Sequence, residues 1–335
     1  MKKRIIWIDL LRIIGMFGVI IIHIAGNTLN TFKLSGVPSI VYTMIYRLLY
    51  FALPLFVMIS GTLLLNKDID YKDIFKKYIK KMVLILLMFG GVYAFLEEYS
   101  INNTVELSSF TNILKRLITG DLWAHMWYIY LLISLYLITP ILRNWVKQTS
   151  EKEQLFCLGV LYIFTILLNE ISSIFNIEIA FTVPITTGFV FSYLLGNYLY
   201  NNELSSKVKS SFYFLGVVSV LAIILLTYFE MFEYLIQYTS TLCMIIAINV
   251  YIIFKDKEFS NKKVCNVICI LGKCSLGIYL IHQLFINIIY KVIKFDLILK
   301  IPYLGIILYF LIIFIPSFVT IYLLKKIKII DKYLL

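Results

Sequence analysis

The chain has 335 residues, of which 61% are hydrophobic and only 15% are charged, and its mean hydropathy is +0.90. Soluble domains are about 45–50% apolar and about 25% charged, so the composition excludes a soluble globular enzyme, a disordered chain and a disulfide-rich secreted module. The net charge of +12 does not indicate nucleic acid, because the basic residues form short clusters between apolar runs, as the positive-inside rule predicts for an all-α, polytopic membrane protein.

Ten apolar runs predict ten transmembrane helices in a single membrane domain over residues 1–335. A bilayer-spanning helix needs roughly 20 apolar residues. The predicted spans are 5–29, 40–65, 82–97, 123–143, 154–171, 180–200, 210–229, 234–254, 264–290 and 302–324. The first run is too long and too polar inside for a cleaved signal peptide, so we expect it to remain as a helix.

The basic residues between these runs are distributed unevenly. With the N-terminus placed inside, 22 Lys and Arg fall in inner segments and 6 in outer segments. This asymmetry predicts that both termini are cytoplasmic and that the number of spans is even. The longest loop, about 98–122, is then expected outside.

The first span contains Asp9, Arg12 and His23. Charged groups inside a membrane are costly and indicate function. Asp9 and Arg12 are one turn apart and can pair. Arg12 and His23 are eleven residues apart, which is almost three turns and about 16 Å of rise, so both lie along one stripe of the helix, with His23 nearer the outer end. A structural role stays open, in which Arg12 reaches the lipid headgroups and His23 bonds a neighbouring helix.

The pattern of apolar and basic side chains over about residues 67–81 predicts an amphipathic helix at the inner membrane interface. Its apolar side chains share one helical face: Ile74, Phe75, Tyr78, Ile79 and Met82. Four lysines lie off that face and are called the lysine cluster below: Lys76, Lys77, Lys80 and Lys81. Two interpretations stay open, an anchor in the lipid headgroups and a docking patch for a phosphorylated cytosolic ligand.

The chain has three histidines, His23, His125 and His282, and all of them fall in the middle-to-outer half of predicted spans. Histidine can act as a base near neutral pH, since its unperturbed pKa is about 6.5. In the ninth span Ser275, Tyr279 and His282 share one face. For His125 and His282 taken singly, a structural hydrogen bond is as reasonable as catalysis, but the clustering favours chemistry for at least one histidine.

Five cysteines lie in or beside the apolar runs, and no CxxC pair occurs. We expect reduced, buried thiols rather than a disulfide framework. We also expect no metal site.

Four segments carry distinctive motifs, in order along the chain. The first segment is 7–14 (WIDLLRII), and His23 lies eleven residues after its arginine. The second segment is 54–61 (PLFVMISG). The third combines 125–128 (HMWY) with 136–140 (YLITP), and the fourth is 275–282 (SLGIYLIH). Together they resemble the integral-membrane acyltransferase-3 family, and most closely its short branch that O-acetylates surface glycans and has no appended hydrolase-like domain. Many members have an arginine pair after the second helix, where this chain has the lysine cluster, and lysine binds phosphate without arginine's bidentate fork.

The resemblance implies an acyl-CoA-dependent O-acyltransferase, multi-pass in the plasma membrane of a bacterium. It would move an acyl group, with acetyl preferred, from cytosolic acyl-CoA to a hydroxyl of an extracytoplasmic or lipid-linked glycan. In this scheme His23 is the general base, Arg12 binds the donor, and Asp9 orients Arg12. The lysine cluster would also bind acyl-CoA. Four residues would line the outer mouth and meet the acceptor: His125, Trp127, Tyr279 and His282.

We expect direct transfer rather than an acyl-enzyme, because no serine or cysteine stands out beside His23. No permanently bound cofactor is expected. The expected partners are the bilayer, acyl-CoA and the glycan, without nucleic acid, and a homo-oligomer stays open. A transporter or flippase for a polar or lipid-linked sugar is the alternative, since ten helices with buried charges would suit a carrier as well.

Overall fold

The computed structural model describes residues 4–102, 107–177, 179 and 188–335, and every regular element in these ranges is helical. The α-helices are α1 (Ile6–Phe32), α2 (Gly36–Leu48), α3 (Ala52–Leu65), α4 (Tyr71–Asp73), α5 (Lys80–Ile85), α6 (Gly91–Asn102), α7 (Leu107–Thr119), α8 (Trp127–Gln148), α9 (Glu151–Tyr162), α10 (Leu168–Phe175), α11 (Phe189–Asn201), α12 (Ser206–Tyr228), α13 (Thr241–Phe254), α14 (Lys262–Asn287), α15 (Leu297–Lys300), α16 (Pro302–Leu324) and α17 (Lys328–Tyr333). The predicted all-α fold is confirmed.

Nine helices within the described ranges are long and apolar enough to cross a bilayer. They are Ile6–Phe32, Gly36–Leu65, Tyr71–Ile101, Trp127–Gln148, Glu151–Phe175, Ser206–Tyr228, Glu233–Phe254, Lys262–Ile293 and Pro302–Leu324. Each overlaps one predicted span, so the prediction of a polytopic helical bundle is also confirmed.

The remaining predicted span, 180–200, falls partly on residues 180–187, which lie outside the described ranges. Its described part is α11, which has only 13 residues. The start of α11 lies beside the start of α8, with the rings of Phe189 and Trp127 5.7 Å apart. Its end lies just beyond the end of α8, where the Tyr198 hydroxyl donates to Glu151. Therefore α11 runs alongside α8, in the direction expected of the sixth span.

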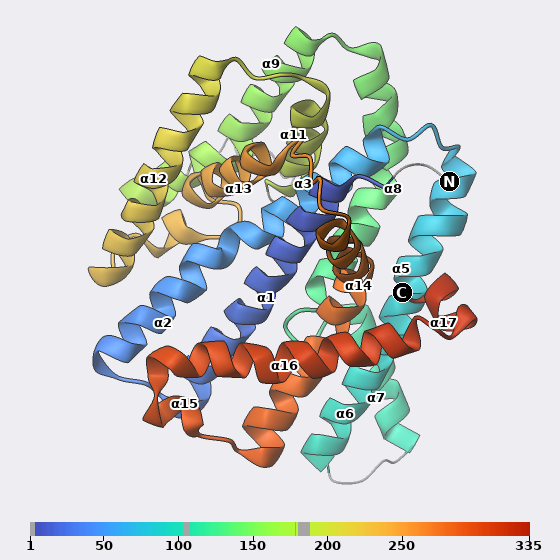
Figure 1. The fold of residues 1–335 in the computed structure, drawn as a ribbon, viewed down its shortest axis with the longest axis vertical. Helices are drawn as coiled ribbons and strands as arrows, with labels where there is room; N and C mark the ends of the chain where they lie inside the picture. Colours follow the sequence, from blue (N-terminus) through green and yellow to red (C-terminus); the bar gives the residue numbers. More distant parts are fainter. Residues whose placement is uncertain (1–3, 103–106, 178, 180–187) are drawn as a thin grey trace.

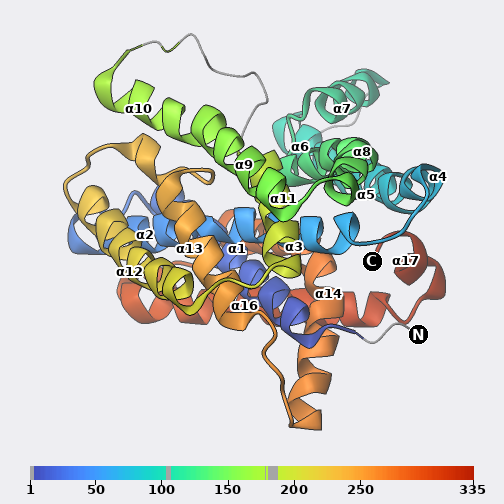
Figure 2. The ribbon, with the colours of Figure 1, turned by 90° about the horizontal axis from the view of Figure 1, so that it is seen from above.

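The first helix, α1, lies at the centre of the bundle, and α2, α3, α14 and α16 pack around it (Figures 1 and 2). Its buried residues extend from Trp7 to Thr28. Because α1 is enclosed on several sides, polar groups along it face protein and cavities rather than lipid. The polar stripe that the sequence indicates therefore lies in the interior of the molecule.

The helices α3 and α11 approach each other closely through two glycines. A Cβ on Gly61 would lie 1.8 Å from the backbone oxygen of Tyr193, and a Cβ on Gly196 would lie 2.0 Å from that of Met58. Small residues at such crossings let helix backbones touch. The Thr62 hydroxyl secures the crossing, because it donates to the Gly196 carbonyl at 2.8 Å.

Helical geometry changes where proline or packing requires it. A 3₁₀ turn, η1 (Leu49–Phe51), separates α2 from α3 just before Pro54. Proline has no N–H, and its ring crowds the carbonyl four residues back, so the local break has a direct cause. Stretches of π-helix occur at η2 (Ile74–Ile79), η3 (Leu86–Gly90), η4 (Ile163–Leu167) and η6 (Ile288–Ile293), and a 3₁₀ turn, η5 (Glu233–Ile236), precedes α13.

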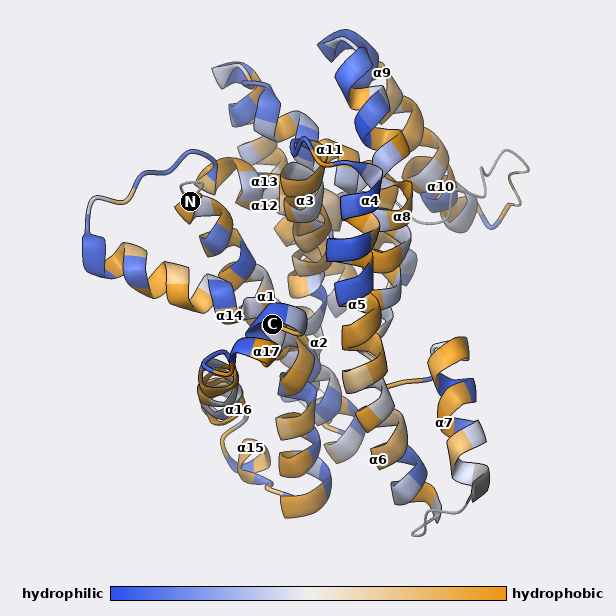
Figure 3. Ribbon diagram, turned by 90° about the vertical axis from the view of Figure 1, so that its right-hand side faces the viewer, coloured by the Kyte–Doolittle hydropathy of each residue, from blue (hydrophilic) through white to orange (hydrophobic). Residues whose placement is uncertain are grey.

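The segment expected to be a separate interfacial helix continues without a break into the third span, as one helix over Tyr71–Ile101. Its beginning is largely hydrophilic and its continuation through α5 and α6 is hydrophobic (Figure 3). The π-turn η2 changes the expected apolar face, because Ile74 and Ile79 are buried whereas Phe75 is 47% exposed. Whether this beginning lies at the membrane interface stays a prediction.

The expected outer loop, about 98–122, contains a helix that the sequence analysis missed. This helix, α7, packs on α6, and Asn112 donates to Glu98 at 2.7 Å. Phe110, Leu114 and Ile118 form an exposed apolar stripe at intervals of four residues. This stripe is the sequence signal for a helix, and it is easily overlooked because the segment is rich in polar residues.

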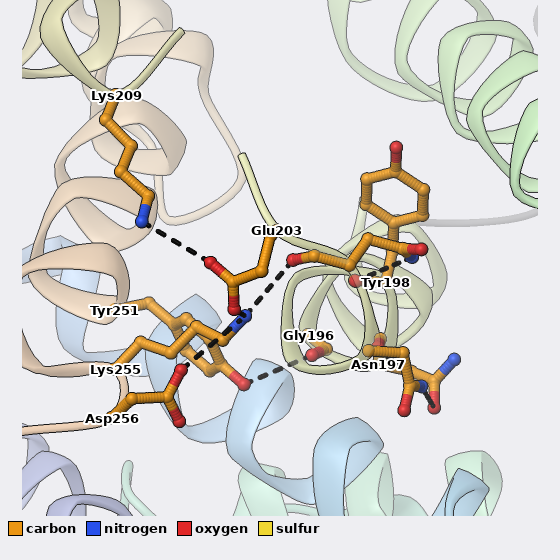
Figure 4. A network of polar contacts seen from close by, with 10 residues as sticks. Gly196, Asn197, Tyr198, Glu203, Lys209, Tyr251, Lys255 and Asp256 are labelled. Atoms are coloured by element: carbon orange, nitrogen blue, oxygen red, sulfur yellow. Dashed lines mark hydrogen bonds and ion pairs between the residues drawn. The ribbon is translucent and has the colours of Figure 1, made fainter. Parts of the chain in front are cut away.

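A polar network joins the end of α11, the start of α12 and the end of α13 (Figure 4). Lys255 donates to Glu203 at 2.8 Å and to the Asn202 carbonyl at 3.1 Å. The hydrogen bond from Lys255, followed by its positive charge, lowers the pKa of Glu203. The network therefore fixes three helix ends on one side of the bundle.

Candidate active site

Asp9 is held by two arginines at the start of α1. Asp9 is 1% exposed and accepts hydrogen bonds from Arg12 Nη1 at 3.0 Å and from Arg4 Nη2 at 2.9 Å. Arg4 Nε also donates to the second carboxylate oxygen. A Cβ on Gly272 would lie 2.7 Å from the Asp9 Cβ, so glycine is needed for α14 to pack here. The predicted pairing of Asp9 with Arg12 is present, and Arg4 completes it.

A cavity of about 350 Å³, called the basic cavity, lies next to this ion-pair group. Four cationic side chains line it: Arg4, Arg12, Lys273 and Lys325. Polar groups of α3, α8 and α14 also line it: Ser60, Tyr128, Tyr136, Ser275 and Tyr279. Asp9 pairs with Arg4 and Arg12, and Asp331 pairs with Lys325 at 2.5 Å. Four cations therefore face two carboxylates, and the cavity keeps an excess of positive charge. It is suited to a polyanion.

A second cavity of about 350 Å³, called the side cavity, shares Arg4 and Arg12 with the basic cavity. Asn66, Lys67 and Tyr200 also line it. The two arginines therefore face two neighbouring spaces, and the basic region of the site is wider than either cavity alone.

None of the lysine cluster lines the basic cavity or the side cavity. Lys76, Lys77 and Lys80 are exposed and Lys81 is half-buried. Lys77 pairs with Asp73 at 2.8 Å. The structure does not bring these lysines to Arg12, and their contact with acyl-CoA stays a prediction.

The three histidines meet in one place, although they lie far apart in the sequence. The ring centroids of His23 and His282 are 5.2 Å apart, those of His125 and His282 are 5.3 Å apart, and those of His23 and His125 are 6.2 Å apart. His125 and His282 are almost fully buried, and His23 is half-buried. In the described part of the chain no group of three or more His, Cys, Asp or Glu is placed to hold a metal ion.

His125 lies in a turn just before α8, not in the span where the sequence analysis placed it. The backbone N–H of Met126 bonds the Trp123 carbonyl, which closes the turn. The side chain nevertheless faces inward, because its Nε2 bonds the Leu280 carbonyl of α14 at 3.0 Å.

A cavity of about 260 Å³, called the histidine cavity, opens beside His23 and His125. Aromatic and amide side chains also line it: Asn27, Asn30, Tyr46, Trp127, Tyr238, Tyr279 and Gln283. Small and aliphatic residues complete the lining: Val19, Ile22, Gly26, Leu53 and Ala124. Three of the four residues predicted at the outer mouth line this cavity, and His282 lies behind it. Hydroxyl, amide and imidazole groups next to aromatic faces can hold a neutral ligand rich in hydroxyl groups.

Tyr279 lines both the basic cavity and the histidine cavity. Its ring packs against those of Tyr128 and Phe56, with centroids 5.5 and 6.5 Å away. Its hydroxyl donates to the His125 backbone carbonyl. The two cavities are therefore separated by a thin aromatic partition with Tyr279 at its centre.

The family model described as an acyltransferase domain matches residues 5–326. The chain belongs to the acyltransferase-3 family. It is thus a multi-pass membrane acyltransferase, and family membership does not favour the transporter or flippase alternative. No curated protein and no solved structure matches the chain.

The sequence analysis missed three of the four cations of the basic cavity, Arg4, Lys273 and Lys325, as site residues. For Lys273 a signal was available, because it is a charge inside an apolar run. Arg4 precedes the first span and Lys325 follows the last, so no local pattern connects them. The five cysteines are unpaired, and two of them, Cys243 and Cys274, are buried.

Proposed function

We propose that this acyltransferase takes acyl-CoA, with acetyl-CoA preferred, in the basic cavity and transfers the acyl group to a hydroxyl of a glycan in the histidine cavity. The observation that carries the proposal is the position of Tyr279, which lines both cavities. A donor and an acceptor bound in these cavities would meet at this partition.

The charge of the basic cavity supports a CoA donor. CoA carries several phosphate charges, and Arg4, Arg12, Lys273 and Lys325 supply the opposite charge around one space. The arginines can bind phosphate in a bidentate manner and the lysines as point charges. The narrow pantetheine arm would then extend from these cations toward Tyr279.

The histidine cavity supports an acceptor hydroxyl and a base. His23 as general base would take the hydroxyl proton while the hydroxyl oxygen attacks the thioester carbonyl carbon. The new carbon–oxygen bond forms, the carbon–sulfur bond breaks, and the proton passes from His23 to the departing thiolate. The scheme needs no acyl-enzyme. The acceptor would be a neutral glycan, since the polar side chains among the described lining residues are amides, tyrosine hydroxyls and imidazoles, beside other aromatic and aliphatic side chains.

The test is release of free thiol from acetyl-CoA by the purified protein in lipid nanodiscs, with and without a glycan acceptor fraction. A double variant, Lys273→Met with Lys325→Met, should raise the KM for acetyl-CoA by about 10²–10⁴-fold, because contacts to charged groups contribute about 1.5–3 kcal/mol each and about 1.4 kcal/mol corresponds to a tenfold change. The matched control replaces the four residues of the lysine cluster by Met and should raise it less than about threefold, as exposed ion pairs contribute little.

The opposite ranking of the two variants would place the donor at the lysine cluster instead. Absence of thiol release by the wild-type protein under both conditions would contradict the CoA donor.

A further inference from the structure

Two of the three histidines have one ring nitrogen bonded to a backbone carbonyl and the other buried without a partner. His282 Nδ1 bonds the Tyr279 carbonyl at 2.6 Å, and its Nε2 has no hydrogen-bond partner. His125 Nε2 bonds the Leu280 carbonyl at 3.0 Å, and its Nδ1 has none. Buried polar atoms without a partner are uncommon and need an explanation.

These bonds determine which nitrogen carries the hydrogen. A carbonyl oxygen only accepts hydrogen bonds, so the bonded nitrogen must be the N–H group. A neutral His282 is therefore protonated at Nδ1, and its Nε2 is a bare acceptor. A neutral His125 is protonated at Nε2, and its Nδ1 is bare. Each ring thus presents one lone pair to the interior.

The distances between the rings indicate which of the two unprotonated nitrogens can accept a hydrogen bond from His23. The ring of His282 is the nearer one to His23, at 5.2 Å between centroids against 6.2 Å for His125. His282 is 0% exposed and does not line the histidine cavity, whereas His23 does. The spacing leaves room for an N–H···N hydrogen bond of about 3 Å. His23 therefore faces the histidine cavity, and the His282 ring, whose Nε2 has no partner in this structure, is the nearer histidine ring.

We propose that His282 is the positioning residue for His23: its Nε2 accepts the N–H of His23 and so directs the bare nitrogen of His23 into the histidine cavity. The inference rests on the proposed function of His23 as base. His282 would then be the third group in the series acceptor hydroxyl, base and orienting residue, which is the arrangement that activates a nucleophile through its base. When His23 takes a proton from the acceptor, the N–H···N bond remains and stabilises the imidazolium.

A spectroscopic test reads the tautomers without activity. The chain has only three histidines, so uniform ¹⁵N-histidine labelling in nanodiscs yields three ring systems, which single substitutions assign. We expect the His282 ring with Nδ1 protonated and Nε2 bare, the opposite of the tautomer that free imidazole side chains prefer. A His282 ring protonated at Nε2 would overturn the proposal.

Two substitutions separate positioning from structural support. In His282→Asn the amide N–H₂ can still donate to the Tyr279 carbonyl, but no acceptor reaches His23. In His282→Gln the longer side chain carries an acceptor to the place of Nε2 and gives up the Tyr279 bond. The Asn variant should lower kcat by about 10–100-fold, the effect of losing one buried charge-assisted hydrogen bond, with the KM for acetyl-CoA within about twofold. The Gln variant should recover most of the rate.

A purely structural role predicts the reverse order, with Asn better tolerated than Gln, and that order would overturn the proposal. Thermal unfolding of both variants checks that each is folded. If the wild-type protein releases no thiol, the proposed function fails, and a His282 ring protonated at Nε2 would still independently overturn the pairing of His23 with His282.

Discussion

At the scale of single residues, the buried carboxylate of Asp9 explains why Arg4 and Arg12 are held together around the first turn of α1. An unpaired charge in this position would be strongly destabilising, and removing one partner of a buried pair is costly. Arg4 and Arg12 both bond Asp9 and both line the basic cavity. Asp9 thus fixes the direction of the guanidinium groups while leaving part of each available to a ligand.

The role of His23 can be tested by substitution. His23→Ala should retain folding and acetyl-CoA binding and should lower the transfer rate by about 10²–10⁴-fold, the range that a positioned general base contributes. The measurement is single-turnover transfer from radiolabelled acetyl-CoA, with donor binding followed separately by titration calorimetry. His23→Gln is the informative companion, since it keeps a hydrogen bond but cannot take the proton. An active Gln variant would contradict the base role.

Sequence reasoning reached the residues of α1 because a helix has a fixed period. The spacing of Asp9, Arg12 and His23 places them along one stripe whatever surrounds the helix. It could not reach Arg4 or Lys325, because their place in the site depends on how the first and last helices pack together. It assigned the donor to Arg12 and, on the family resemblance, to the lysine cluster, whereas the other cations of the basic cavity are brought together only by the fold.

At the scale of helices, the crossing of α3 and α11 places Ser60 in the basic cavity. The crossing depends on Gly61 and Gly196, which leave no room for a side chain. The spans themselves could be predicted from apolar runs and α7 from its apolar stripe, but the π-turns could not. A π-turn adds one residue to a turn without a distinct sequence signal, and it moved Phe75 off the face that a regular helix predicts.

A substitution at this crossing should destabilise the fold. Gly196→Val forces its side chain into the Met58 backbone, and we expect at least about 1–3 kcal/mol of destabilisation, the usual cost of overpacking. The midpoint of thermal unfolding in detergent measures it. Gly159→Val on α9 is the matched control, because a Cβ there meets nothing within 4 Å, and valine in place of an exposed helical glycine should be neutral or stabilising. Equal midpoints for the two variants would contradict the close crossing.

At the scale of the whole molecule, the two ends of the chain meet at one cavity. Arg4 precedes α1, Lys325 follows α16, and both line the basic cavity. The two termini also lie on the same side of the bundle in Figure 1. Ends on one side require an even number of crossings. Nine helices of the described ranges are long and apolar enough to cross a bilayer, and an even number requires α11, with its 13 described residues, to belong to a tenth crossing, which stays a prediction.

The absolute orientation can then be tested by labelling. We expect α7 outside and the α13–α14 connection inside, because 22 basic residues fall on the inner side and 6 on the outer side. In a variant lacking the five native cysteines, Phe110→Cys should react with a membrane-impermeant maleimide in intact cells, since this position is 63% exposed. Lys257→Cys, also exposed, should react only after the cells are permeabilised. The reverse pattern would place the basic cavity outside, where cytosolic acyl-CoA could not enter it, and would reverse the direction of transfer.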